Sequence, residues 1–301
     1  MKQAIIVLLL VLLGAWVAIA QQAPPTKEKP AVPAKEKAAA GAAEKPTGFE
    51  NLYKEIGVGI ERLNNQDTTG LGYGLANWGF PVVPEWNLGG QVGGKITARR
   101  DDPDWLAAAG LFQRDIALGS MTGAWAVEGI YQNTQEHADL LSIKPILGVE
   151  FMKDNYLVLT GIIGVNEEHL QRAGGVVTAE QEAVDTAMLL WGTQWMDKFR
   201  TELGAGYEFS DIDRMVLGVH AAYQIDKMMN ANLTVQSDFR DAYFVSVGLG
   251  LDLGRNGANG SFNNITKTRP SDYTPFPLGS LPVPFYETHV LGATETPPST
   301  E

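Results

Sequence analysis

Cysteine is absent from this chain of 301 residues, and histidine is rare, with four residues. Without cysteine there is no disulfide framework, no thiolate metal site and no lipid attached through an N-terminal thiol. The histidines do not pair at a spacing that suits a metal ion, and His220 alone falls within a clearly patterned segment. The sequence therefore predicts no metal, no cofactor and no catalytic residue.

Basic residues are also scarce. Lys and Arg number 23 against 35 Asp and Glu, which gives a formal net charge of -12. A nucleic-acid partner is disfavoured, because the phosphate backbone requires a basic surface on the protein.

Long apolar runs are limited to the N-terminus. Lys2 precedes an apolar run from Ala4 to Leu13, and the small-x-small end Ala18 to Ala20 follows. This layout is typical of a secretory signal peptide, and the run is short for a membrane span of about 20 residues. We expect residues 1–20 to be a cleaved signal peptide; the alternative is an N-terminal membrane anchor.

Residues 21–53 contain few large apolar side chains. From Gln21 to Thr47 the chain consists largely of Ala, Pro, Lys and Glu. Such a composition cannot bury enough surface to fold. We expect a periplasmic linker, and contact with peptidoglycan or envelope proteins is the alternative.

Residues 54–254 alternate between apolar and small or polar residues, and a period of two predicts β-strands. Tyr243, Val245 and Val247 share one face of the last segment, whereas Phe244 and Ser246 share the other. About twelve strands are predicted, namely Glu55–Arg62, Leu71–Trp78, Trp86–Arg99, Trp105–Arg114, Ala124–Gln132, Leu141–Phe151, Tyr156–Asn166, Thr186–Met196, Glu202–Ser210, Arg214–Gln224, Ala231–Arg240 and Tyr243–Leu253.

Alternation alone fits a soluble sandwich as well as a membrane barrel. Segments of about ten residues, glycine-rich polar faces and aromatic residues near segment ends favour the membrane. We therefore predict an all-β, antiparallel transmembrane β-barrel of about 12 strands in lipid of the cell outer membrane. The aromatic residues near segment ends are Trp86, Trp105, Trp125, Tyr131, Tyr156, Trp195, Tyr223 and Tyr243.

The predicted connection lengths agree only partly with a membrane barrel. With an even number of strands, the N- and C-terminal residues of the barrel domain both face the periplasm, where connections between strands are short. The connector Glu167–Asp185 falls outside, as a long loop should. Phe80–Glu85 and Asp115–Gly123, however, are long for inner turns.

Residues 255–301 form a Pro-rich tail, in which regular helix and central strand are excluded. We expect it to be extended. It either lies loosely or packs on the barrel or a partner through the apolar residues Phe276, Leu278, Leu281, Val283, Phe285 and Tyr286.

Three stretches carry a resemblance: GLGYGLANWGFPVVPEWNLGGQVGGKITAR, WLAAAGLFQRD and GAWAVEGIYQNT. Together they resemble a family of exported β-barrel-like proteins of unknown function, known chiefly from planctomycetes. The likeness spans Leu71 to Gly164 and implies export and a barrel. It implies no catalytic residue.

Charges on the predicted polar faces are the candidate functional residues, because rings of charge inside a barrel set ion preference. Three functions follow: a narrow porin-like channel for ions or small solutes, a closed-barrel structural or surface-interaction protein, and a lipid-modifying enzyme as the least favoured alternative. The candidate lumen-facing residues are Lys95, Arg99, Arg114, Glu128, Lys144, Glu150, Glu202, Glu208, His220, Asp238, Arg240 and Asp252.

Overall fold

A computed structural model describes residues 51–62, 67–99, 103–134, 136–152, 154–171, 177–196, 198–209, 214–226, 228–240, 242–252, 281–284 and 286–290. The predicted signal peptide and nearly all of the predicted linker lie outside these residues. Within them, no helix is long and apolar enough to span a bilayer, and the short 3-10 turn η1 (Pro84–Trp86) interrupts the strands.

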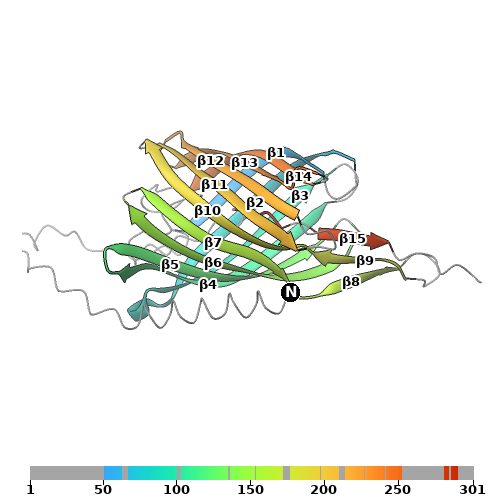
Figure 1. Cartoon of the computed structure of the whole chain (residues 1–301), viewed down its shortest axis with the longest axis horizontal. Coiled ribbons are helices and arrows are strands. Elements are labelled where there is room, and N and C mark those ends of the chain that lie inside the picture. The colour runs from blue at the N-terminus through green and yellow to red at the C-terminus, as the bar shows by residue number, and fades with distance from the viewer. Residues whose placement is uncertain are drawn as a thin grey trace, which may run out of the picture.

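Twelve antiparallel strands close into a barrel, as Figure 1 shows from the side. They are β1 (Leu52–Arg62), β2 (Thr69–Val83), β3 (Leu88–Ala98), β4 (Asp104–Leu118), β5 (Met121–Asn133), β6 (Asp139–Met152), β7 (Asn155–Gly164), β10 (Asp185–Met196), β11 (Phe199–Phe209), β12 (Arg214–Gln224), β13 (Met229–Ser237) and β14 (Tyr243–Asp252). The predicted fold class is confirmed, and each predicted segment overlaps one barrel strand.

The barrel closes where its first and last strands meet. Tyr53 of β1 pairs with Asp252 of β14, and Arg62 pairs with Tyr243. We call the mouth at Leu52 and Asp252 the first end, and the mouth at Arg62 and Tyr243 the second end.

Connections at the first end are shorter than the sequence suggested. Phe80 lies within β2, and Asp115 lies within β4, which continues to Leu118. The residues predicted as long inner connectors therefore lie largely in strands. Only the two residues Gly119 and Ser120 join β4 to β5. The longest connection, between β7 and β10, lies at the second end.

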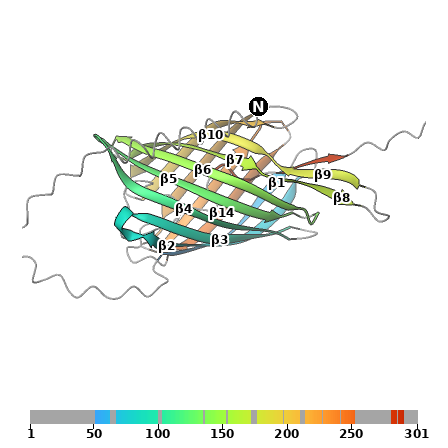
Figure 2. The same ribbon diagram turned by 90° about the horizontal axis from the view of Figure 1, so that it is seen from below.

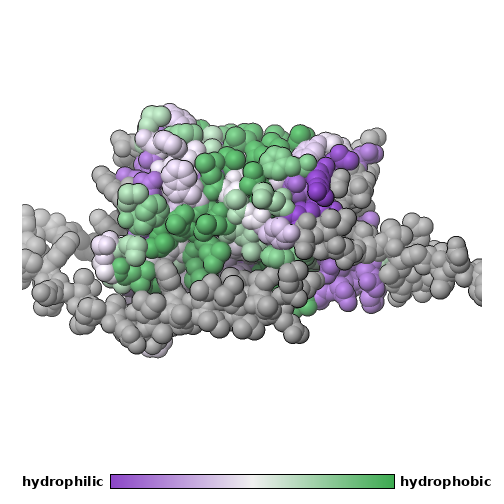
Figure 3. All heavy atoms as spheres, in the orientation of Figure 1, coloured by the Kyte–Doolittle hydropathy of each residue, from purple (hydrophilic) through white to green (hydrophobic). Residues whose placement is uncertain are grey.

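The outer face of the barrel is apolar because alternate strand residues point outward. Ile56 and Val58 of β1 are 68% and 67% exposed, whereas Glu55, the residue before Ile56, points to the other face and is buried. Figure 3 shows hydrophobic residues gathered over the middle of the visible wall, with hydrophilic residues toward the end where β8 and β9 project. Exposed apolar and buried polar side chains reverse the arrangement of a soluble domain and suit a lipid surround.

Aromatic side chains mark the two rims. Trp86, Trp195 and Tyr223 are exposed at the first end, and Trp105 is exposed at the second. Such girdles are typical of the interfaces of a membrane barrel. Tyr156 also lies near a strand end, but its side chain faces inward and is buried.

A second, three-stranded sheet extends from the second end. It consists of β8 (Glu167–Gln171), β9 (Val177–Ala183) and β15 (Tyr286–Val290), in the order β15-β9-β8. Figure 2 shows β8 and β9 projecting beyond the barrel mouth. The two hairpin strands belong to the connector between β7 and β10, whereas β15 comes from the C-terminal tail.

Residues of the tail also lie inside the barrel. Leu281 and Val283 are buried and pack with inward-facing residues such as Val216, Ala222 and Phe244. Of the apolar tail residues that the sequence singled out, these two therefore pack against the barrel.

Candidate functional site: the barrel lumen

Several charged side chains in the lumen form ion pairs. Arg214 of β12 donates from a terminal nitrogen to Asp238 Oδ2 at 2.8 Å, and both residues are buried. The other oxygen, Asp238 Oδ1, accepts from the backbone N–H groups of Arg240 and Ala242, at 2.9 Å each. The carboxylate thus joins the charge of β12 to the turn between β13 and β14.

A second charge cluster lies at the second end, between β1, β3 and β4. Arg99 donates through Nε to Glu61 and through a terminal nitrogen to Asp104. All three side chains are largely buried. A guanidinium group suits this position because its donors diverge in a fixed plane and can serve two carboxylates.

A tyrosine cluster surrounds Glu55 nearer the first end. Tyr53 donates to Glu55 Oε2 at 2.5 Å, and Tyr73 donates to Glu55 Oε1 at 2.5 Å. Asn232, across the barrel seam on β13, donates to Glu55 Oε2 at 2.7 Å. The carboxylate is therefore bonded by three strands.

Glu128, Lys144 and Glu202 extend the polar interior around β5, β6 and β11. Glu128 and Lys144 are register partners on neighbouring strands, and Gln91 donates to Glu128. Tyr156 donates to Glu202 at 2.6 Å. The two buried carboxylates thus accept from neutral donors, and Lys144 lies beside one of them in register, which reduces the cost of removing these charges from water.

Three further candidate residues contact aromatic rings or a hydroxyl group. Lys95 lies over the rings of Tyr73 and Phe244, with Nζ 5.1 Å from each centroid, and Arg114 lies over Phe112 at 5.3 Å. His220 Nδ1 is 2.9 Å from the Thr234 hydroxyl.

Two carboxylates among the candidates lie toward opposite ends of their strands. Glu208 is buried and pairs in register with Arg214. Glu150 is half-buried and accepts from the backbone of Asp154 in the turn at the first end.

Arg240 and Asp252 lie beyond or at the end of their strands. Arg240 is not a lumen residue: it follows β13, lies in the turn to β14 and is exposed. The prediction failed because strand alternation was continued past Ser237, where the backbone turns. Asp252 ends β14 opposite Tyr53, and its side chain lies outside the described residues.

Sequence reasoning missed the phenol groups of the lumen. Tyr53 has the same parity as Glu55 in β1, so alternation alone would have placed it inside. Tyr156 was noted only as an aromatic residue near a segment end, although its parity matches the inward Val158 and Thr160. Parity was the better signal than position along the strand.

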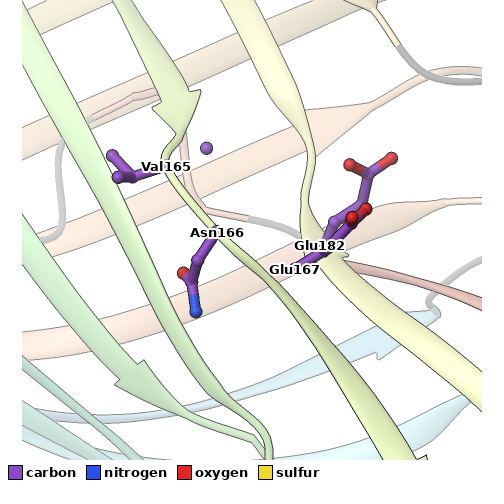
Figure 4. Close-up of a pocket in the computed structure, with 5 residues that line it drawn as sticks. Val165, Asn166, Glu167 and Glu182 are labelled. Atoms are coloured by element: carbon purple, nitrogen blue, oxygen red, sulfur yellow. The ribbon is translucent and has the colours of Figure 1, made fainter.

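Metal-ligating side chains are not grouped in the part of the chain that the structure describes. In that part of the chain no group of three or more His, Asp or Glu side chains could hold a metal ion. A pocket of about 270 Å³ lies beside the β8–β9 hairpin. Figure 4 shows its acidic residues Glu167 and Glu182 next to each other, and they are register partners.

Comparisons with known proteins concern the barrel. No protein-family model and no curated protein matches the chain. Solved structures of outer-membrane barrels are similar to it. A KdgM porin has a TM-score of 0.45 at 7% identity, with 66% of this chain and 98% of the porin covered.

Outer membrane phospholipase A from Escherichia coli has a TM-score of 0.42 at 12% identity, with 67% and 93% of the two chains covered. Acinetobacter baumannii outer membrane protein Omp33 has a TM-score of 0.38 at 8% identity, with 68% and 99% covered. At these values the likenesses decide neither transport nor catalysis.

The geometry of the barrel is that of a membrane protein. A closed barrel satisfies every ladder hydrogen bond without an open edge, which the hydrocarbon of a bilayer requires. The exterior is apolar, the interior holds paired charges, and aromatic residues line both rims. The chain has the architecture of an outer-membrane β-barrel.

Proposed function

We propose that the protein is a closed outer-membrane barrel that anchors a contact region at the cell surface, and that it is not a permanently open porin. One observation carries the proposal. Lys144 and Glu128 are each 1% exposed, and Gln236 is 0% exposed. Side chains that line a water-filled channel keep exposed surface, so the lumen is filled at the level of these residues.

The contact region in this proposal is the sheet of β8, β9 and β15. Its attachment to the barrel mouth is specific: Thr134 donates to Gln181 Oε1 at 2.7 Å, and Gln181 donates to Glu136 at 2.6 Å. Gln181 is buried, whereas Glu167 and His169 are exposed. A sheet fixed at its base with charged residues outward is suited to contact another envelope component.

The orientation follows from connection lengths. Long connections of outer-membrane barrels face the outside and short turns face the periplasm. The longest connection of this barrel lies at its second end, and the short β4–β5 turn lies at its first. We therefore propose that the second end faces the cell surface.

Other readings of the sequence stay predictions. They are the narrow channel for ions or small solutes, the absence of enzymatic activity, the signal peptide, the linker and its peptidoglycan contact, and the planctomycete resemblance. A channel would require the buried pairs in the lumen to separate.

Planar-bilayer recording of the purified full-length protein tests the closed lumen. Folded protein is identified by a heat-dependent shift in gel mobility. We expect no steady conductance from such protein. A steady conductance proportional to voltage would overturn the proposal and favour the channel.

Surface labelling tests the orientation. The chain has no cysteine, so His169→Cys and Met228→Cys each create a single thiol at an exposed position, at the second and first end respectively. A maleimide too large to cross the outer membrane should label the 169 variant in intact cells. The 228 variant should react only after permeabilisation, and the reverse pattern would contradict the orientation.

A further inference from the structure

The C-terminal segment is held inside the lumen by specific contacts. The Val283 N–H donates to Gln236 Oε1 at 2.8 Å, and Gln236 Nε2 donates to the Val283 carbonyl at 3.3 Å. Lys144 Nζ lies 3.5 Å from the Pro282 carbonyl oxygen. Because Gln236 and Lys144 are buried on inward faces of β13 and β6, residues 281–284 lie between opposite parts of the barrel wall.

A glycine of β12 makes room for this segment. A Cβ atom at Gly218 would collide with the side chain of Leu281. Leu281 is 1% exposed and belongs to the main apolar cluster of the interior. The contact places Leu281 inside the barrel, on the face of β12 that presents His220 and at the level of Gln236, the register partner of Gly218.

The described residues also fix the direction of the chain. Val283 is bonded to Gln236, next to the last residue of β13 at the second end. Tyr286 then pairs with Ala183 at the barrel rim, and Val290 pairs with Ala179 farther along β9. From Leu281 to Val290 the chain therefore runs out of the lumen through the second end.

The preceding strand ends on the opposite side. Asp252, the last residue of β14, pairs with Tyr53 at the first end. Since β15 lies beyond the second end, the chain changes from one mouth of the barrel to the other after β14.

We infer that the barrel is threaded by its own C-terminal segment: residues 281–284 occupy the lumen, and β15 leaves it through the second end, across the membrane from the end of β14. The strand β15 then lies across the membrane from Tyr53 and Asp252. The threading depends on the register and the lumen contacts alone. Only the statement that the second end faces the cell surface rests on the proposed function.

Single-cysteine labelling tests the threading. Glu287→Cys and Thr288→Cys occupy neighbouring positions in β15, and neighbouring strand residues point to opposite faces, so one thiol should be accessible. We expect at least one of them to react under the conditions that label His169→Cys, and opposite to those that label Met228→Cys. Reaction of the β15 cysteines together with Met228→Cys would overturn the inference.

This design separates two failures. If His169→Cys and β15 react only after permeabilisation while Met228→Cys reacts in intact cells, the proposed orientation is wrong and the threading stands. If β15 reacts on the side of Met228→Cys, the threading is wrong whatever the orientation.

Disulfide formation provides an independent test of the position inside the lumen. The pair Gly218→Cys and Leu281→Cys should cross-link on oxidation, which changes gel mobility after boiling without reductant. The pair Gln236→Cys and Val283→Cys serves if the first variant does not fold. Gly218→Cys with Thr288→Cys is the control that should stay open. Failure of both lumen pairs in protein with a heat-dependent mobility shift would contradict the inference.

Discussion

The barrel wall and the segment inside it are held in different ways. Every residue from Tyr53 to Arg62 has a register partner in β14, so the wall is a continuous ladder. Residues 281–284 are bonded instead by the side chains of Gln236 and Lys144, and by the packing of two apolar residues. Because one hydrogen bond contributes about 0.5–1.5 kcal/mol net, the inserted segment can loosen while the wall stays closed.

The wall itself is most sensitive to loss of a buried charge partner. Arg214→Met leaves Asp238 buried without its cation, and breaking such a pair costs about 3–5 kcal/mol. We expect urea unfolding in lipid vesicles, followed by tryptophan fluorescence, to show this loss. Addition of Asp238→Asn, which keeps the shape of the side chain but removes its charge, should recover part of it. Wild-type stability in Arg214→Met would mean that the pair does not hold the wall.

A charge introduced on the outer face should destabilise the same wall from the lipid side. Val58 lies near the middle of β1 and is exposed, so Val58→Arg should cost about 2–4 kcal/mol. Met215→Arg is the matched control, because Met215 lies one residue from the second end of β12 and should cost about 0–1 kcal/mol. Equal effects on vesicle unfolding would contradict the assigned depth of the two positions.

Loosening the inserted segment should leave the wall nearly unchanged. Gln236→Leu removes both hydrogen bonds to Val283, and leaving a buried backbone group without a partner costs about 1–3 kcal/mol. Hydrogen exchange of peptides containing Val283 should accelerate by about tenfold to a hundredfold, while β1 peptides stay protected. Thr234→Val, on the same inward face of β13 but bonded to His220, should not have this effect.

The smallest effect is expected in a turn that touches neither the lumen nor the lipid belt. Hydrogen bonds from the backbone N–H groups of Met228 and Met229 lower the pKa of Asp226. A lowered folded-state pKa stabilises the protein above the unfolded value of about 3.9, and the contribution disappears as pH falls through the folded value. Asp226→Ala should therefore be slightly less stable than the wild type at pH 7, and the difference should vanish in acid. A difference that grows in acid would contradict this assignment.

Alternation of residue character was sufficient for the wall. In β14, Val247 and Leu249 are exposed to the outside while Phe244 and Ser246 are buried inside, as the period of two predicts. Strand ends were harder to predict, because Phe80 and Asp115 continue strands through residues that resemble turns. For Arg240 the error was the opposite, because the alternating pattern of the sequence continues after β13 has ended at Ser237.

The lumen pairs could not be predicted from the sequence. Glu55 and Asn232 are far apart in the chain and meet because barrel closure places β13 and β1 on either side of β14. Charges such as Glu128 and Glu202 were recognised as inward by parity, but their partners depend on register and on the curvature of the sheet. Parity specifies a face, whereas a pair requires two strands in a known alignment.

The sequence by itself determined that this chain forms β-strands with one apolar face, because a strand has a period of two and each face must match its surroundings. Segment length, glycine content and aromatic positions then favoured a membrane barrel over a sandwich. The tertiary structure alone decided which partners the inward charges meet and where residues 281–284 lie. The tail has no repeating pattern that would reveal its position. Its location follows only from the space at Gly218 and from the bonding groups of Gln236, which closure of the barrel brings together.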